Sequence, residues 1–169
     1  MSPERIVMKP HIRRSSLLVV LLGWSVFPAT PPAMGQGKDA FLGTWLLDSD
    51  KSTFVPGPVP EDRTMIFELK DGALRHLTKT PNLFLGNTND IDYTARFDGK
   101  DYSITGTGLD TVSLKRVDSH KIERTGKVQG KVTEHCTMEV SRDGRVLTLT
   151  VKGSYNGTGY SSVQVLTRQ

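Results

Sequence analysis

Hydrophobic and polar residues alternate along most of the chain after residue 40. Residues 90–97 are the clearest case, with polar side chains at the even positions and apolar side chains at the odd ones. Residues 147–152 repeat the pattern. A period of two places successive side chains on opposite faces of a β-strand. No stretch after residue 40 keeps a helical apolar period over several turns, so the pattern predicts an all-β fold.

Turn signals separate these alternating segments at the spacing of hairpins. They are Asp71-Gly72, Asp98-Gly99, Asp143-Gly144 and Asn156-Gly157. We therefore expect nine or ten strands, over residues 42–48, 63–70, 73–79, 90–97, 101–105, 110–117, 121–126, 130–140, 145–152 and 159–167. Short loops between consecutive strands favour antiparallel neighbours, and with no helix to cover it the apolar face is best hidden by closure. The predicted fold is a single antiparallel up-and-down (meander) β-barrel of about 8–10 strands.

Two segments interrupt the alternation. Residues 50–62 are rich in proline and can form neither a helix nor a central strand. Residues 80–89 contain the apolar triplet Leu83-Phe84-Leu85, which could cap the mouth of the barrel or pack beneath it.

The first 35 residues have the pattern of an export signal. A basic stretch ending at Arg13-Arg14 precedes an apolar run over residues 17–27, which is short of the roughly 20 residues that span a bilayer. The small residues Ala33 and Gly35 fit cleavage before Gln36. We expect residues 1–35 to be a signal peptide and residues 36–169 a single domain exported to the periplasm or secreted, by the Sec or the twin-arginine route. An anchor that is retained is the alternative.

Charge and cysteine content narrow the possible partners. The formal net charge is +4, but residues 1–35 hold four basic groups and one acidic group, which leaves 18 basic and 17 acidic groups after Gly35. A nearly neutral domain does not favour nucleic acid as a partner. Cys136 is the single cysteine, so no internal disulfide is possible and the domain must be held by burial. We expect a monomer without a transmembrane segment in its mature form.

The segment Phe41-Leu42-Gly43-Thr44-Trp45 at the start of such a meander resembles the calycins, the superfamily of lipocalins and fatty-acid-binding proteins. Residues 43–54 and 93–117 resemble exported bacterial lipocalin-like proteins that are mostly uncharacterised. The resemblance implies that Trp45 closes one end of the barrel and that Arg168 could stack on it. The Arg-x-Tyr pair that binds the ligand carboxylate in fatty-acid-binding proteins is missing from the last strand, and so is their helical lid. The resemblance therefore implies the fold and leaves the ligand open.

Catalytic motifs are missing from the sequence. It contains no Gly-x-Ser-x-Gly elbow and no phosphate-binding loop. His135 and Cys136 are neighbours on a strand and so point to opposite faces, which prevents a thiol–imidazole pair. Asp90 and Asp92 fall on the polar, solvated face, and His76 is either a half-buried side chain or a contact for haem or another ligand. We expect no enzyme activity, no catalytic residue, no metal site and no cofactor.

The function predicted from these patterns is the binding of a small hydrophobic or amphipathic molecule inside the barrel. The residues expected to line the interior are Met65, Phe67, Tyr93, Phe97, Cys136 and Met138, with Phe84 at the entrance. Arg116 and Arg124 lie on facing strands, and if both point inward they are buried cations that await an anionic ligand group. If they point outward, they only solubilise the surface. The alternatives are a filled-barrel interaction module of the cell envelope with a protein partner and, less favoured, an enzyme built in the barrel.

Overall fold

The computed structural model describes residues 39–80 and 90–169, so the predicted signal peptide and Phe84 lie outside the described residues. The described chain is built from β-strands and one short 3₁₀ turn, η1 (Ser49–Lys51). The strands are β1 (Gly43–Leu47), β2 (Thr53–Val55), β3 (Thr64–Lys70), β4 (Ala73–Lys79), β5 (Ile91–Ala95), β6 (Tyr102–Thr105), β7 (Thr111–Arg116), β8 (Lys121–Val128), β9 (Lys131–Val140), β10 (Val146–Tyr155) and β11 (Thr158–Arg168). Ten of them match the strands expected from the alternation, and β2 is an addition within the proline-rich segment.

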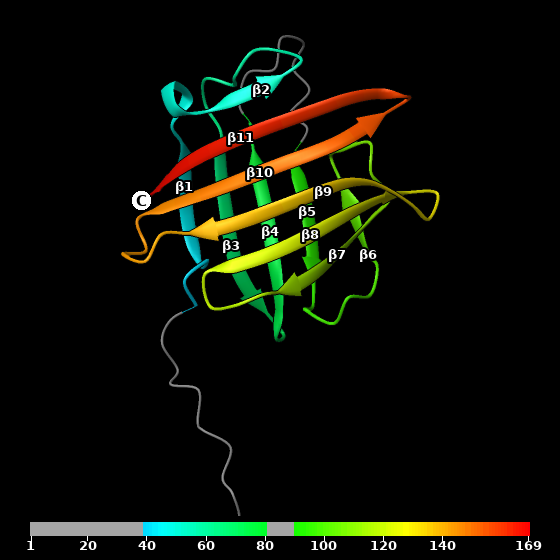
Figure 1. Ribbon diagram of the computed structural model, residues 1–169. Helices are drawn as coiled ribbons and strands as arrows, with labels where there is room; N and C mark the ends of the chain where they lie inside the picture. The colour runs from blue at the N-terminus through cyan, green and yellow to red at the C-terminus, as the bar shows by residue number, and fades with distance from the viewer. Residues whose placement is uncertain (1–38, 81–89) are drawn as a thin grey trace, which may run out of the picture. The chain divides into compact units, whose positions relative to one another are not determined.

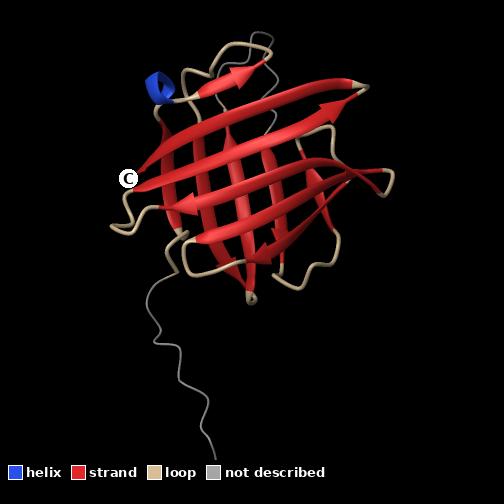
Figure 2. Ribbon diagram, viewed as in Figure 1, coloured by secondary structure: helices blue, strands red, loops and turns tan. Residues whose placement is uncertain are grey.

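The strands form a closed antiparallel barrel. From β3 to β11 each strand pairs with the next in the chain, and β1 pairs with both β3 and β11, which closes the sheet. Figure 1 shows β8–β11 crossing steeply in front of β1 and β3–β5. Figure 2 shows that strands make up nearly all of the barrel. The prediction of an all-β, up-and-down β-barrel of the lipocalin-like type is confirmed.

Strand β2 continues the path of β1 along β11. β1 pairs with the last residues of β11, through Trp45 and Arg168, whereas β2 pairs further back, through Phe54 and Ser162. The 3₁₀ turn separates the two, and β2 pairs with β11 alone. The expectation that residues 50–62 hold no central strand is therefore confirmed.

The two ends of the barrel differ. We call the end that carries residues 39–42 and the β3–β4, β7–β8 and β9–β10 turns the closed end. The opposite end, with residues 56–63 and the β6–β7, β8–β9 and β10–β11 turns, is the open end; β2 lies beside it at the top of Figure 1. Apolar side chains fill the barrel towards the closed end, namely Phe41, Trp45, Phe67, Leu74, Leu114, Ile122, Met138, Leu147 and Leu166. Buried polar side chains lie from mid-strand towards the open end, namely His76, Thr78, Thr80, Arg124, Glu134, Ser162 and Gln164.

Trp45 and Arg168 fasten the closed end. The indole of Trp45 is fully buried and its Nε1–H donates to the backbone oxygen of Phe41 at 2.9 Å. The Arg168 guanidinium lies 4.1 Å from the centre of the Trp45 ring. It also donates to the backbone oxygens of Ala40, Leu42 and Gly144. The stacking of Arg168 on Trp45 that the calycin resemblance suggests is confirmed.

Candidate functional site

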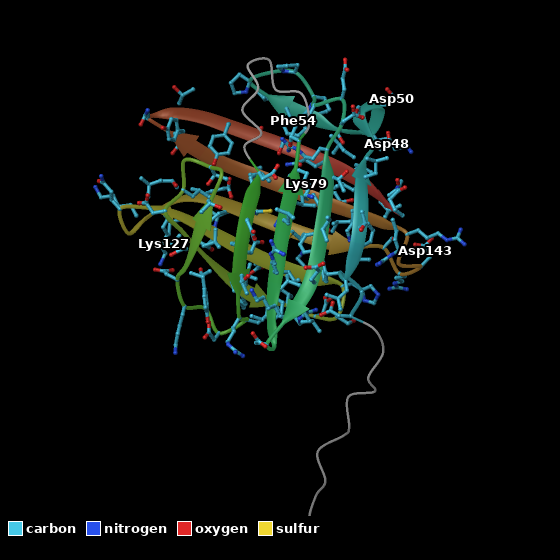
Figure 3. All side chains as sticks on the ribbon, turned by 180° about the vertical axis from the view of Figure 1, so that it is seen from behind. Asp48, Asp50, Phe54, Lys79, Lys127 and Asp143 are labelled. Carbon is cyan, nitrogen blue, oxygen red and sulfur yellow. The ribbon has the colours of Figure 1, made fainter. Side chains whose placement is uncertain are left out.

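A pocket of about 210 Å³ enters the barrel at the open end, beside β2 and β11. One part of its lining is apolar and comprises Phe54, Val55, Pro56, Ile91 and Val151. The polar part comprises Thr107, Arg124, Glu134, Tyr160, Ser161, Ser162 and Gln164. Phe54, labelled in Figure 3, lies at this end of the barrel. The pocket therefore combines apolar side chains with hydrogen-bonding groups, of which Arg124, Glu134, Ser162 and Gln164 are buried.

A buried ion pair forms the polar floor of the pocket. Arg124 on β8 and Glu134 on β9 are each 7% exposed, and the Arg124 Nη2 donates to Glu134 Oε1 at 2.6 Å. The second carboxylate oxygen of Glu134 accepts a hydrogen bond of 2.8 Å from the Tyr160 hydroxyl. Burial disfavours the charge of Arg124, but Cys136, Tyr93 and Glu134 outweigh it and hold the pKa of Arg124 above its ordinary value. The floor is thus a charged pair with no net charge.

Both arginines singled out in the sequence face inward, but neither lacks a partner. Arg116 lies at the closed end, where its Nη2 donates to Asp39 at 2.6 Å and its guanidinium lies 4.2 Å from the centre of the Phe97 ring. Arg124 is paired with Glu134. Neither of the two alternatives therefore holds: the arginines do not lie on the outer surface, and as inward cations they do not await an anionic ligand, because a buried charge without a partner is costly. Arg116 and Phe97 belong to the closed end and do not line the pocket.

The other predicted interior residues do point into the barrel. Met65, Phe67, Tyr93, Cys136 and Met138 are all buried. They pack within the core, and none of the five lines the pocket of about 210 Å³. Burial raises the pKa of the Cys136 thiol to about 11, which leaves it protonated and unreactive at neutral pH. His135 is exposed on the opposite face, as the alternation predicts.

Six polar residues of the pocket were not found by sequence reasoning: Thr107, Glu134, Tyr160, Ser161, Ser162 and Gln164. Glu134, Cys136 and Met138 are every second residue of β9 and so lie on the same face of the strand. The inward direction of Glu134 could therefore have been inferred from the alternation. Ser162 and Gln164 could not, because on β11 the polar positions face inward while Val163 is partly exposed.

Distant partners stabilise this reversed polarity of β11. Arg63 Nη1 donates to Gln164 Oε1 at 2.9 Å, and Gln164 Nε2 donates to Ser162 Oγ at 3.0 Å. Tyr160 reaches Glu134 by lying across Gly153 of β10, where a Cβ atom would stand only 2.6 Å from the phenol oxygen. Glycine at position 153 therefore makes room for the Tyr160 side chain.

His76 is bound on both sides within the barrel. Its Nδ1 lies 3.0 Å from the Tyr93 hydroxyl and its Nε2 lies 2.9 Å from Thr78 Oγ1. Its ring stacks on Phe67 with the ring centres 4.4 Å apart. Because both ring nitrogens are engaged, the side chain offers neither to haem or another ligand. Over residues 39–80 and 90–169, no group of three or more His, Cys, Asp or Glu side chains could hold a metal ion.

The burial of His76 predicts a pH dependence of stability. Burial, together with the charges of Arg124 and Arg63, lowers the pKa of His76 well below 6.5. At mildly acidic pH the His76 side chain is therefore protonated in the unfolded chain but not in the folded protein. The free energy of unfolding decreases as the pH falls through the pKa that His76 has in the unfolded chain. We expect the free energy of unfolding to fall by up to about 1.4 kcal/mol per pH unit between about pH 6.5 and pH 5.

Urea titrations of the protein and of His76→Gln at several pH values measure this slope. The variant should have a much flatter profile over the same range. Parallel profiles would assign the slope to other groups and contradict the prediction.

The chain folds as a closed ten-strand meander barrel with a buried Trp45 and a stacked Arg168 at one end, a fold of the lipocalin-like type. Among solved structures, zebrafish ileal bile acid-binding protein in complex with cholic acid is similar to this chain, with a TM-score of 0.51 and 13% sequence identity. The similarity covers 77% of this chain and 99% of that one. No protein-family model matches the chain. No curated protein matches it either. The described residues include no helix long and apolar enough to cross a membrane.

Proposed function

We propose that the protein is a non-enzymatic binding protein that takes a small hydrophobic or amphipathic molecule into the open end of its barrel. The observation that carries this proposal is the pocket of about 210 Å³, whose lining combines apolar side chains with buried polar ones. Binding sites for small molecules typically combine an apolar lining with a few converging polar groups. The bound cholic acid in the similar zebrafish structure supports the same kind of function.

The state of Glu134 supports a binding role over a catalytic one. Its two carboxylate oxygens accept hydrogen bonds from Arg124 and Tyr160. Both oxygens are thus engaged by donors within the protein rather than open to a substrate proton. The export signal predicted for residues 1–35 supports a place of action outside the cytoplasm.

The size of the pocket limits the ligand. At about 210 Å³ the pocket is smaller than the roughly 300–1,000 Å³ of sites for drug-sized molecules. A second pocket of about 150 Å³ shares Thr107, Glu134 and Tyr160 with the first, so the two pockets are neighbours. The site as it stands fits a compact molecule.

Native mass spectrometry tests the proposal. The protein is purified, exposed to a total lipid extract, and compared with Ser162→Phe, which fills the pocket, and with Val163→Phe, which adds the same ring on the outer face of β11. We expect a discrete added mass on the protein and on Val163→Phe that is lost from a folded Ser162→Phe. A bare mass for all three proteins would contradict the proposal and favour the filled-barrel interaction module. An unchanged adduct on Ser162→Phe would show that the molecule binds elsewhere.

A further inference from the structure

The hydrogen-bond acceptors on the floor of the pocket are already in use. Glu134 accepts one hydrogen bond from Arg124 at 2.6 Å and one from Tyr160 at 2.8 Å. The side-chain oxygen of Gln164 accepts from Arg63 at 2.9 Å. A ligand that offers a hydrogen-bond donor therefore meets acceptors that already have donors.

Buried residues of the pocket lining carry hydrogen-bond donors that have no acceptor within the described part of the chain. The Nε–H of Arg124 is buried and has no acceptor within the described part of the chain. Ser162 Oγ accepts a hydrogen bond from Gln164 Nε2, which leaves the Ser162 hydroxyl hydrogen free to rotate and donate. A buried donor without an acceptor costs free energy, so a ligand that supplies an acceptor here gains affinity.

The charge on the floor is already balanced. The positive charge of Arg124 is matched by Glu134, and both groups are almost fully buried. A ligand carboxylate placed against this pair would bring a second negative charge close to Glu134 in a poorly hydrated site. Arg63 is not itself part of the pocket lining, but it hydrogen-bonds to Gln164 and its guanidinium lies 5.2 Å from the centre of the Phe54 ring, and both of those residues line the pocket.

We propose that the ligand is an uncharged molecule with an apolar body and a carbonyl group, as in a ketone, aldehyde or ester, that accepts hydrogen bonds from Arg124 Nε–H and Ser162 Oγ–H. This inference rests on the proposed binding function and names its ligand class. It distinguishes the site from one built for a carboxylate.

A matched pair of probes tests the inference. Octanoate and methyl octanoate have the same tail and differ in the charge of the polar end. Their affinities are measured at neutral pH by displacement of the neutral fluorescent dye N-phenylnaphthylamine from the full-length protein. We expect the ester to bind at least about tenfold more tightly than the acid, because the charged end must be desolvated beside Glu134.

Equal affinities, or tighter binding of octanoate, would overturn the inference while leaving the binding function in place. If neither the dye nor either probe binds and the added mass is also missing in native mass spectrometry, the proposed function fails and the inference fails with it. The two failures are therefore distinguishable.

The variant Glu134→Gln tests the physical cause. It keeps the shape of the side chain but leaves the charge of Arg124 unmatched, so the affinity ratio should shift by about tenfold towards octanoate. Glu139→Gln removes the same charge from the outer face of β9 and is the matched control. The same ratio in both variants would overturn the charge argument. If Glu134→Gln does not fold, the inference is tested by the affinities of octanoate and methyl octanoate for the unmodified protein alone.

Discussion

Replacing Arg124 by methionine is expected to lower the free energy of unfolding by about 3–5 kcal/mol, because Glu134 then remains buried without its cation. The Arg124 guanidinium and the Glu134 carboxylate are each about nine-tenths buried, so water cannot replace the lost partner. The loss is measured by urea unfolding at neutral pH. From the sequence alone, methionine at an inward arginine is expected to weaken the binding of an anion and spare the fold. The partner Glu134 changes that expectation.

Two controls isolate the effect of the ion pair. The double variant Arg124→Met/Glu134→Met should be more stable than Arg124→Met alone, since an apolar pair can replace a buried ion pair with little loss. Lys121 and Glu139 form an exposed pair on the same two strands, and Lys121→Met should cost less than about 1 kcal/mol. A double variant as unstable as the single one would contradict the idea that an unpaired carboxylate causes the loss.

Replacing Trp45 by alanine is expected to lower the free energy of unfolding by about 3–5 kcal/mol, as for other large side chains deleted from a core. The substitution leaves a cavity at the closed end and removes the hydrogen bond from the indole to Phe41. It also removes the ring on which the Arg168 guanidinium stacks. Urea unfolding followed by circular dichroism measures the change without relying on tryptophan fluorescence.

Neighbouring substitutions provide the comparison for Trp45. Trp45→Phe keeps most of the apolar volume and loses the N–H donor, so its cost should be smaller than that of alanine. Leu46→Ala changes the next residue of β1, whose side chain is 39% exposed, and should have a small effect. A Trp45→Ala protein as stable as Leu46→Ala would mean that the closed end does not depend on the indole.

Most of the barrel could be predicted from the sequence because its signals are local. Residues 90–97 show the alternation within a single strand, and a pair such as Asn156-Gly157 marks its own turn with two left-handed residues. Strand β2 was missed for the opposite reason. It is three residues long, lies within a proline-rich segment, and is held only by pairing with β11, more than a hundred residues later in the chain.

The polar floor could be predicted only in part. The alternation within each strand is enough to place Arg124 and Glu134 inside the barrel. Their contact, however, depends on the register between β8 and β9, which shifts at Gly126 and Lys127. The inward direction of Gln164 depends on Arg63, 101 residues away in the sequence. Hydrophobicity argues against a polar residue inside a barrel, and only a distant partner makes it favourable.

The contact between the two ends of the barrel domain has a consequence for its biosynthesis. Arg168 binds backbone oxygens of Ala40 and Leu42, and β1 is covered on one side by β11, so closure joins segments more than 120 residues apart. A ribosome must therefore produce β11 before the barrel can close. Until then the nascent sheet has two free edges and an uncovered apolar face, the features that lead to aggregation and to slow, non-local folding. The nascent chain is therefore most prone to aggregate before strand β11 has been made.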